Sequence, residues 1–183
     1  MKSRLFITLD IPEFVQNKII EYRIKLYNDE KIRWEPKNKY HITLKFLGDV
    51  KESKIDDIVE QLEIVAQENS EINLAFNRFG LFFRGNDPKI LWAGFSYDDK
   101  LTELKNQIET ALSGFGFPSE KRKYKPHITI CRLKGFEDDG KIKTFSKYEF
   151  PKIDFRSNSI ELIESKLTSK GSEYKILNSF NLS

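Results

Sequence analysis

Residues 39–44 read Lys-Tyr-His-Ile-Thr-Leu and residues 125–130 read Lys-Pro-His-Ile-Thr-Ile, so nearly the same phrase occurs twice in one chain. The two copies begin 86 residues apart, each follows a basic stretch that contains a tyrosine, and helical patterns lie between them. Self-similarity within a chain indicates a repeated structural unit. We therefore expect two similar halves, placed so that the two phrases face one another.

The apolar residues around the phrases predict a mixture of strands and helices. Short extended runs predict strands over residues 5–9, 32–34, 40–47, 72–83, 89–95, 124–133, 153–165 and 173–180. Helical spacing predicts helices from an Asp10 cap to about Tyr27, over residues 55–65 and over residues 101–112, with a helical turn at 142–145. Turns at residues 85–88 and 168–172 join strands into hairpins. Because hairpins dominate over strand–helix–strand units, the expected fold class is α+β with antiparallel sheets.

The length of 183 residues suits one domain, which at this size buries roughly 70% of the surface that its unfolded chain exposes. Hydrophobic residues make up 39% of the chain, and no low-complexity linker divides it. We therefore expect residues 1–183 to form a single domain, in which any two lobes share one compact body.

Charge and composition exclude several classes of protein. The balance of 31 basic against 28 acidic residues gives a net charge of +3, which is too mild to indicate a nucleic-acid binder by itself. No apolar run approaches the ~20 residues that span a bilayer, and the N-terminus is interpreted as a first strand rather than a signal peptide. The single cysteine, Cys131, excludes an intramolecular disulfide and a thiolate zinc cage. A cytoplasmic protein without membrane contact is expected.

The two phrases contain both histidines of the chain, His41 and His127. Thr43 and Thr129 follow them by two residues, although only seven residues of the chain are Thr. Residues i and i+2 of a strand share a face, so each phrase presents an imidazole and a hydroxyl on one side and aliphatic side chains on the other. If the two strands are adjacent, both pairs converge on one cleft.

Two other interpretations of the histidines were weighed. A histidine on a strand is often structural, and threonine there reflects β-propensity. Packing alone, however, explains neither the duplication nor the confinement of histidine to the phrases. A metal site is the second alternative, but two histidines without a matched Asp, Glu or Cys form a poor ligand set. Paired general acid and base catalysis is favoured, because one imidazole can accept a proton while the other donates one near neutral pH.

The pattern favours phosphodiester chemistry over acyl transfer. Threonine hydroxyls and nearby Arg or Lys side chains suit the extra negative charge of a pentacoordinate phosphorane. No Ser or Cys nucleophile is paired with either histidine by the pattern. A phosphoryl group held between two imidazoles is thus the expected substrate centre.

At this point the sequence resembles the 2H phosphoesterases, in particular bacterial and archaeal RNA 2′,3′-cyclic phosphodiesterases, also called 2′-5′ RNA ligases. The two His-x-Thr-aliphatic phrases carry the resemblance, and segments such as Arg33-Trp34, residues 91–94 and residues 164–167 extend it over essentially the whole chain. It implies two pseudo-duplicated α+β lobes, each with an antiparallel sheet and flanking helices, around a central cleft. It also implies hydrolysis of RNA 2′,3′-cyclic phosphate ends to 2′-phosphomonoesters, without metal or other cofactor.

The resemblance further implies a role for each residue of the phrases. His41 would be the acid that protonates the leaving 3′ oxygen, and His127 would be the base that activates water. Thr43 and Thr129 would hold the non-bridging phosphate oxygens.

Arg132 matches a family arginine on the phosphate, and Phe46 matches an aromatic near the nucleoside. Both lie five residues after a histidine, which strict alternation places on the opposite face of the strand. These two assignments therefore require a bulge or a strand end.

Two functions remain as alternatives to hydrolysis of cyclic phosphate ends: a nucleotide- or RNA-binding module without turnover, and a reversible 2′-5′ RNA ligase. The expected partner is an RNA with a 2′,3′-cyclic phosphate end or a small cyclic nucleotide, bound by a monomer.

The remaining side chains have weaker expectations. Residues 121–125 either steer phosphate or form a solvated loop. Tyr40 and Tyr124 either belong to the core or stack a base, and the core is favoured. The side chains expected to pack inside the protein are Cys131, Trp34 and Trp92.

Overall fold

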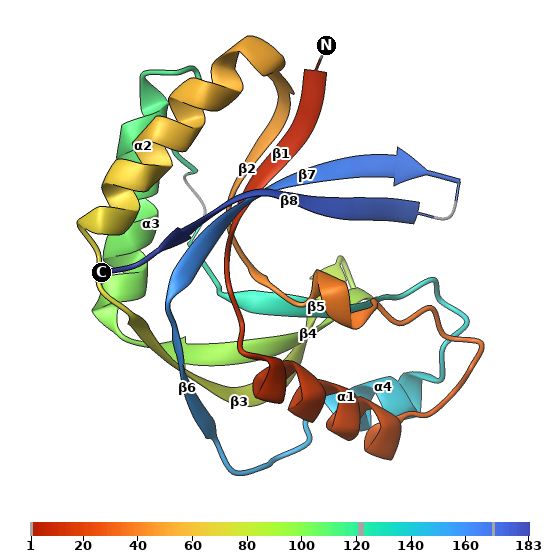
Figure 1. The fold of residues 1–183 in the computed structure, drawn as a ribbon. Coiled ribbons are helices and arrows are strands. Elements are labelled where there is room, and N and C mark those ends of the chain that lie inside the picture. The colour runs from red at the N-terminus through yellow and green to blue at the C-terminus, as the bar shows by residue number, and fades with distance from the viewer. Residues whose placement is uncertain (1, 121–122, 170) are drawn as a thin grey trace.

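The computed structural model describes residues 2–120, 123–169 and 171–183, which form two four-stranded antiparallel sheets (Figure 1). In spatial order the first sheet contains β2 (Ile42–Lys51), β1 (Lys2–Leu9), β7 (Ser159–Thr168) and β8 (Gly171–Asn181). The second contains β5 (His127–Arg132), β4 (Asp87–Tyr97), β3 (Ile72–Arg84) and β6 (Ile153–Ser157). The expected α+β fold with antiparallel sheets is confirmed. The basic residues Lys121 and Arg122 lie outside the described residues.

Four α-helices connect the strands: α1 (Glu13–Leu26), α2 (Ile55–Gln67), α3 (Asp99–Ser113) and α4 (Asp139–Ser146). Two short 3₁₀ helices, η1 (Lys37–Lys39) and η2 (Glu52–Lys54), precede β2 and α2. The expected cap at Asp10 is wrong, because the Asp10 amide bonds to Ser159 in the neighbouring strand and α1 begins directly after Pro12. None of the helices in the described parts of the chain is long and apolar enough to cross a membrane.

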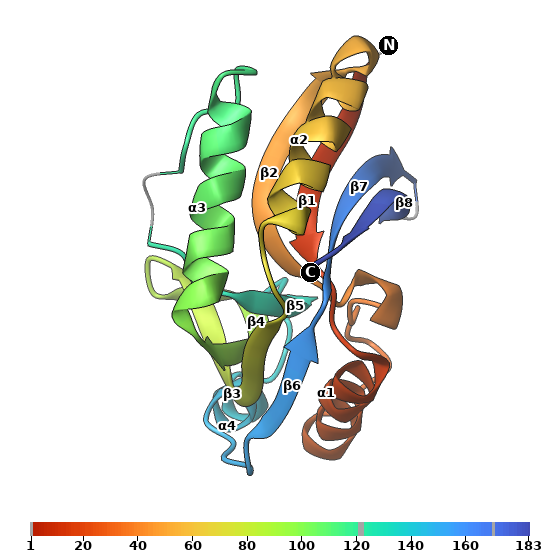
Figure 2. The same ribbon diagram turned by 60° about the vertical axis from the view of Figure 1, so that its left-hand side comes forward.

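The helices cover the sheets crosswise. In Figures 1 and 2, α2 and α3 lie together, and they pack against β2, β7 and β8 of the first sheet. Helix α4 packs on β3 and β4, and α1 reaches the same sheet although it follows β1. Its Tyr22 ring lies 4.7 Å from Phe150 and about 6 Å from Phe76 and Phe79 of β3, measured between ring centroids. Each sheet is therefore covered in part by a helix that follows a strand of the other sheet.

The sequence pattern predicts one strand over residues 153–165, but this segment forms two strands in different sheets. Residues 153–157 pair with β3, whereas residues 159–168 pair with β1, and Asn158 lies between them. Backbone and side-chain bonds hold the crossing point: the Ser157 hydroxyl donates to the Asp10 carbonyl at 2.7 Å, and the Leu182 amide donates to the Asn158 carbonyl at 2.8 Å. Four consecutive polar residues, 156–159, occupy the crossing, and the apolar positions change there from 153 and 155 to 160 and 162. The sequence thus carries a local sign of the break that the prediction of a single strand did not use.

Candidate active site

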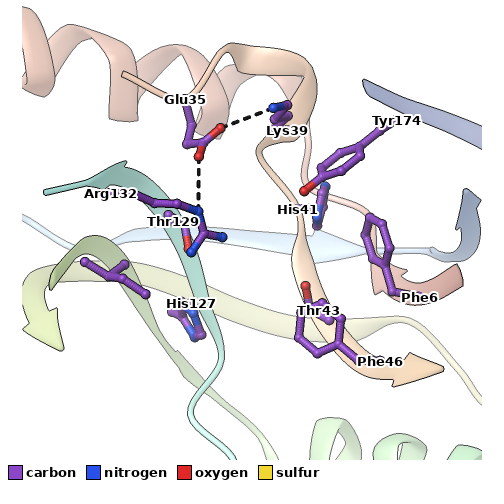
Figure 3. A pocket seen from close by; sticks show the side chains of 11 residues that line it. Phe6, Glu35, Lys39, His41, Thr43, Phe46, His127, Thr129, Arg132 and Tyr174 are labelled. Carbon is purple, nitrogen blue, oxygen red and sulfur yellow. Dashed lines mark ion pairs between the residues drawn. The ribbon is translucent and has the colours of Figure 1, made fainter. Parts of the chain in front are cut away.

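The two histidine phrases lie on the edge strands of the two sheets. His41 immediately precedes β2 and His127 is the first residue of β5, and each strand is the outermost of its sheet. The two strands are therefore not hydrogen-bonded neighbours in one sheet but face one another from separate sheets. The space between them is a cleft of about 260 Å³ that both histidines line (Figure 3).

The cleft brings together all six residues singled out in the sequence: His41, Thr43, Phe46, His127, Thr129 and Arg132. The aliphatic partners in the phrases point the other way, since Ile42 and Ile128 are fully buried in the core. Alternation along the two strands thus separates reactive side chains from core side chains, as the pattern predicts.

A bulge in each strand explains why residues five places after the histidines also face the cleft. In β2, Thr43 pairs with Thr8 and Lys45 with Ile7, which leaves Leu44 without a partner. In β5, Thr129 pairs with Trp92 and Cys131 with Leu91, which leaves Ile130 unpaired in the same way. One extra residue reverses the alternation beyond it.

The bulge therefore occurs at the corresponding position of the two phrases, three residues after each histidine. Its consequence is visible in burial, because two consecutive residues face the interior in both strands: Leu44 and Lys45 in β2, and Ile130 and Cys131 in β5. The next residue then returns to the cleft, as Phe46 in one strand and Arg132 in the other.

The imidazole of His41 lies among aromatic rings. Its centroid is 5.3 Å from that of Phe6 on β1 and 5.5 Å from that of Tyr174 on β8. Burial against these rings and, to a smaller extent, the charge of the nearby Lys39 ammonium together lower the pKa of His41 to about 4. In the free protein His41 is therefore neutral at pH 7.

The imidazole of His127 has a fixed tautomer. Its Nδ1 lies 2.8 Å from the Lys125 carbonyl oxygen, which only accepts hydrogen bonds, so Nδ1 carries the proton and Nε2 keeps its lone pair. The Phe82 ring meets the imidazole edge-on, with centroids 4.8 Å apart. Burial lowers the pKa of His127, the Lys125 carbonyl opposes this effect, and Arg132 adds a smaller lowering.

Glu35 is the main site residue that sequence reasoning missed. Figure 3 shows its carboxylate between two cations, with Oε1 3.4 Å from Nε of Arg132 and Oε2 3.5 Å from Nζ of Lys39. The Glu35 amide also donates to the Ile130 carbonyl at 2.8 Å, which attaches this loop to the edge of β5. Glu35 therefore orients both cations beside the cleft.

Phe6, Lys39 and Tyr174 are further lining residues without an assigned role in the sequence. Phe6 comes from β1 beside β2, Lys39 from the 3₁₀ turn before β2, and Tyr174 from β8 at the other edge of the sheet. Only the completed fold brings them to the histidine. The repeated phrase carries no signal for them. The described parts of the chain contain no group of three or more His, Cys, Asp or Glu side chains placed to hold a metal ion.

The side chains expected in the interior follow the prediction with one exception. Tyr40 and Cys131 are buried, Trp34 and Tyr124 pack against the core, and burial raises the pKa of the Cys131 thiol to about 12. Trp92 is the exception. Its indole lies over Gly80 and Gly94, where an added Cβ would approach it to 2.3 and 2.5 Å, and it lies 6.4 Å from His127 between ring centroids. Leu91 and Ala93 fill the core instead, so Trp92 supports the face of the sheet that carries His127.

Comparison with known proteins identifies relatives of this chain. A family model described as LigT like phosphoesterase matches residues 9–92 and 96–174. A Methanocaldococcus jannaschii protein named RNA 2′,3′-cyclic phosphodiesterase is 33% identical, over 95% of this chain and 98% of its own length. A Thermotoga maritima protein of the same name is also 33% identical, over 95% of this chain and 92% of its own length.

Solved structures share the fold at lower sequence identity. Escherichia coli LigT in complex with 3′-AMP superimposes with a TM-score of 0.78 at 22% identity, covering 100% of this chain and 99% of LigT. A Thermus thermophilus protein superimposes with a TM-score of 0.81 at 22% identity, covering 98% of this chain and 97% of its own. The two-lobed arrangement is therefore shared across these proteins.

Proposed function

The chain belongs to the LigT-like phosphoesterase family, and on that premise we propose that it hydrolyses RNA 2′,3′-cyclic phosphate ends to 2′-phosphomonoesters. The observation that carries the proposal is the meeting of both imidazoles, both threonines and Arg132 in one cleft. An acid, a base and donors for a charged phosphoryl group are the requirements of this reaction, and the cleft offers each of them.

In the proposed step, water attacks phosphorus while Nε2 of His127 takes its proton. The bond from phosphorus to O3′ breaks, and the proton of His41 passes to the departing O3′. The ester to O2′ remains, so the product carries a 2′-phosphate and a free 3′-hydroxyl. The hydrogen bond from Nδ1 of His127 to the Lys125 carbonyl keeps the proton on Nδ1 and leaves Nε2 free to accept a proton. This arrangement supports the proposed role of His127 as the base.

The acid role of His41 depends on the substrate. With a pKa of about 4, His41 has no proton to donate in the free protein at pH 7. A phosphate anion within a few ångströms favours the imidazolium and raises this pKa. We therefore propose that His41 becomes the acid only in the complex.

The test is hydrolysis of an oligonucleotide that ends in a 2′,3′-cyclic phosphate, in the presence of EDTA. A 2′-phosphate product is expected, and His41→Ala or His127→Ala should slow its formation by about 10²–10⁴-fold, the usual contribution of a positioned acid or base. Circular dichroism of both variants would show whether they fold. A 3′-phosphate product, or activity that EDTA abolishes and zinc restores, would contradict the two-histidine scheme.

Arg132 provides a second test of the same site. Arg132→Lys keeps the charge but loses the planar pair of donors, so kcat/KM should fall by about 10- to 100-fold, because a hydrogen bond to a charged group contributes about 1.5–3 kcal/mol. Lys100→Arg on α3 is the matched control, since it exchanges the same two side chains at a residue that does not line the cleft. Unchanged turnover by Arg132→Lys would remove the arginine from the site.

Two alternatives use the same residues. A binding module would retain affinity for the cyclic end but show no product, and a ligase would join this end to a 5′-hydroxyl. Incubation with and without a second RNA that carries a 5′-hydroxyl distinguishes the three outcomes by product length and phosphate position.

A further inference from the structure

A second depression continues from the catalytic cleft, between the loop 33–39 and the β7–β8 hairpin. It shares Glu35, Lys39, Arg132 and Tyr174 with the cleft. Beyond them its lining adds the cations Arg33 and Lys134 together with the polar residues Asn38 and Ser172. We call this depression the basic trough.

The lining of the basic trough is unevenly charged. Four cationic side chains line it against two carboxylates, and Glu35 already holds Lys39 and Arg132 by ion pairs. The Arg33 guanidinium lies directly over Gly171, where an added Cβ would come within 2.6 Å of Nη2. Gly171 has a φ of +120°, a conformation that other residues rarely adopt. The turn of the hairpin thus leaves room for the arginine head.

A different depression opens at the other end of the cleft. It shares Thr43, Phe46 and His127 with the cleft. Its further lining consists of Leu44, Phe82 and Tyr124 together with the charged residues Glu120, Lys123 and Lys125. The residues that the two depressions share with the cleft are different, and in Figure 3 Glu35, Lys39 and Tyr174 lie on the side of the cleft opposite Phe46 and His127. One end of the cleft therefore offers the aromatic rings of Phe46, Phe82 and Tyr124 with two lysines and one carboxylate, and the other end is the basic trough with four cations and two carboxylates.

We propose that the basic trough binds the phosphodiester backbone upstream of the cyclic end, so that the protein selects oligonucleotides over mononucleotides. The proposal rests on the proposed function. In a nucleoside 2′,3′-cyclic phosphate the base leaves the ribose from C1′ and the upstream chain leaves it from C4′, on opposite sides of the cyclic ester. With the cyclic phosphate between the histidines and the base at the aromatic end, the 5′ phosphate enters the basic trough.

Electrostatics predicts how much this contact contributes. An exposed ion pair contributes about 0.2–1 kcal/mol, which corresponds to a change of up to about fivefold in binding. Each phosphate neutralised on a single strand adds about −0.7 to the slope of log affinity against log salt concentration. The basic trough should therefore be detected by KM and by its dependence on salt rather than by kcat.

The experiment compares a mononucleoside 2′,3′-cyclic phosphate with a trinucleotide that has the same terminal nucleoside and cyclic end. The wild-type protein should show a lower KM for the trinucleotide and a steeper dependence on salt. Lys134→Glu should raise the KM of the trinucleotide about fivefold or more and leave that of the mononucleotide unchanged, because the lost attraction is replaced by repulsion. Lys100→Glu is the matched control, since Lys100 belongs to α3, a helix that lies away from the hairpin in Figures 1 and 2.

Several results would overturn the proposal. Equal KM values for the two substrates in the wild-type protein would exclude a contact upstream of the cyclic end. Equal effects of Lys134→Glu on both substrates, or of Lys100→Glu and Lys134→Glu on the trinucleotide, would exclude the basic trough as its place. If neither substrate is hydrolysed, the proposed function fails. The basic trough is then tested by the affinity of the wild-type and Lys134→Glu proteins for a 3′-phosphorylated trinucleotide, and equal affinities would overturn it.

Discussion

His41 and His127 belong to the same phrase, yet their neighbours differ. His41 lies between Phe6 and Tyr174 and next to Lys39, whereas His127 donates Nδ1–H to a carbonyl and contacts Phe82. Titratable pairs whose surroundings push their pKa values apart are typical of acid–base division of labour. The asymmetry arises from the strands beside each phrase and not from the phrase itself.

The first prediction concerns the charge of His41. Its pKa of about 4 should rise when an anion occupies the cleft, because negative charge favours the imidazolium. Sulfate is a suitable probe, since its own charge is constant across this range of pH. NMR titration of the two imidazoles, with and without sulfate, measures the change. Lys39→Gln should raise the pKa of His41 without sulfate, and an unchanged pKa in both experiments would contradict the assigned surroundings.

The second prediction concerns the pH dependence of turnover. The profile of kcat/KM reports the ionisations of the free enzyme, and that of kcat reports those of the complex. Both imidazoles have pKa values lowered from the ordinary 6.5 in the free protein. The bell of kcat/KM should therefore be centred below pH 6.5, and the bell of kcat should be centred at higher pH because bound phosphate raises both pKa values. Coincident bells would show that substrate does not change the ionisation of either histidine.

At the scale of the elements, a buried ion network connects β2 to α3 and to residues 118–120, which precede β5 in the chain. Lys45, on the interior side of the β2 bulge, places Nζ 2.5 Å from Glu109 on α3 and donates to the Pro118 carbonyl at 2.9 Å. Glu109 also binds Lys105 at 2.8 Å and accepts from the Glu120 amide at 3.3 Å. The network thus holds the segment that leads toward His127 against the strand that follows His41.

The third prediction follows from this network. Lys45→Met should lower the free energy of unfolding by about 1–3 kcal/mol, because it leaves the Pro118 carbonyl unpaired and Glu109 with one cation fewer. It should also reduce kcat while circular dichroism stays native-like. Lys37→Met is the control, since Lys37 forms an ion pair with Glu13 at the same 2.5 Å but in solvent, where the loss should be below about 1 kcal/mol. Equal losses in the two variants, measured by urea denaturation, would contradict a role for burial.

The elements also show what a sequence can predict. The helices and the hairpin of β3 and β4 follow from periodicity and turn residues, because these signals are local. The cleft face of each phrase follows from alternation in the same way. Arg132 and Phe46 face the cleft only because each strand contains a bulge, and no residue type in the sequence indicates where these bulges occur. Glu35 contacts Arg132 across 97 positions of sequence, so its place depends on the completed fold.

At the scale of the whole molecule, the crosswise helices couple the two sheets. Helix α1 leaves the first sheet and packs by Tyr22 on the second, while α3 follows the second sheet and contacts β2 of the first. Buried residues of both sheets form one continuous core. Each sheet loses part of its cover of helices if the other unfolds, so we propose that residues 1–183 unfold as one domain.

Tryptophan fluorescence provides the test of this coupling, because both indoles report on the second sheet. Trp34 bridges to Cys131 of β5, and Trp92 lies on β4. Ile58, fully buried on α2, belongs instead to the cover of the first sheet. Ile58→Ala should destabilise the protein by about 2–5 kcal/mol, the usual cost of such a cavity. If the chain is one cooperative unit, the fluorescence midpoint in urea should fall together with that of far-ultraviolet circular dichroism. A fluorescence midpoint that stays at the wild-type value while circular dichroism divides into two transitions would show two independent domains.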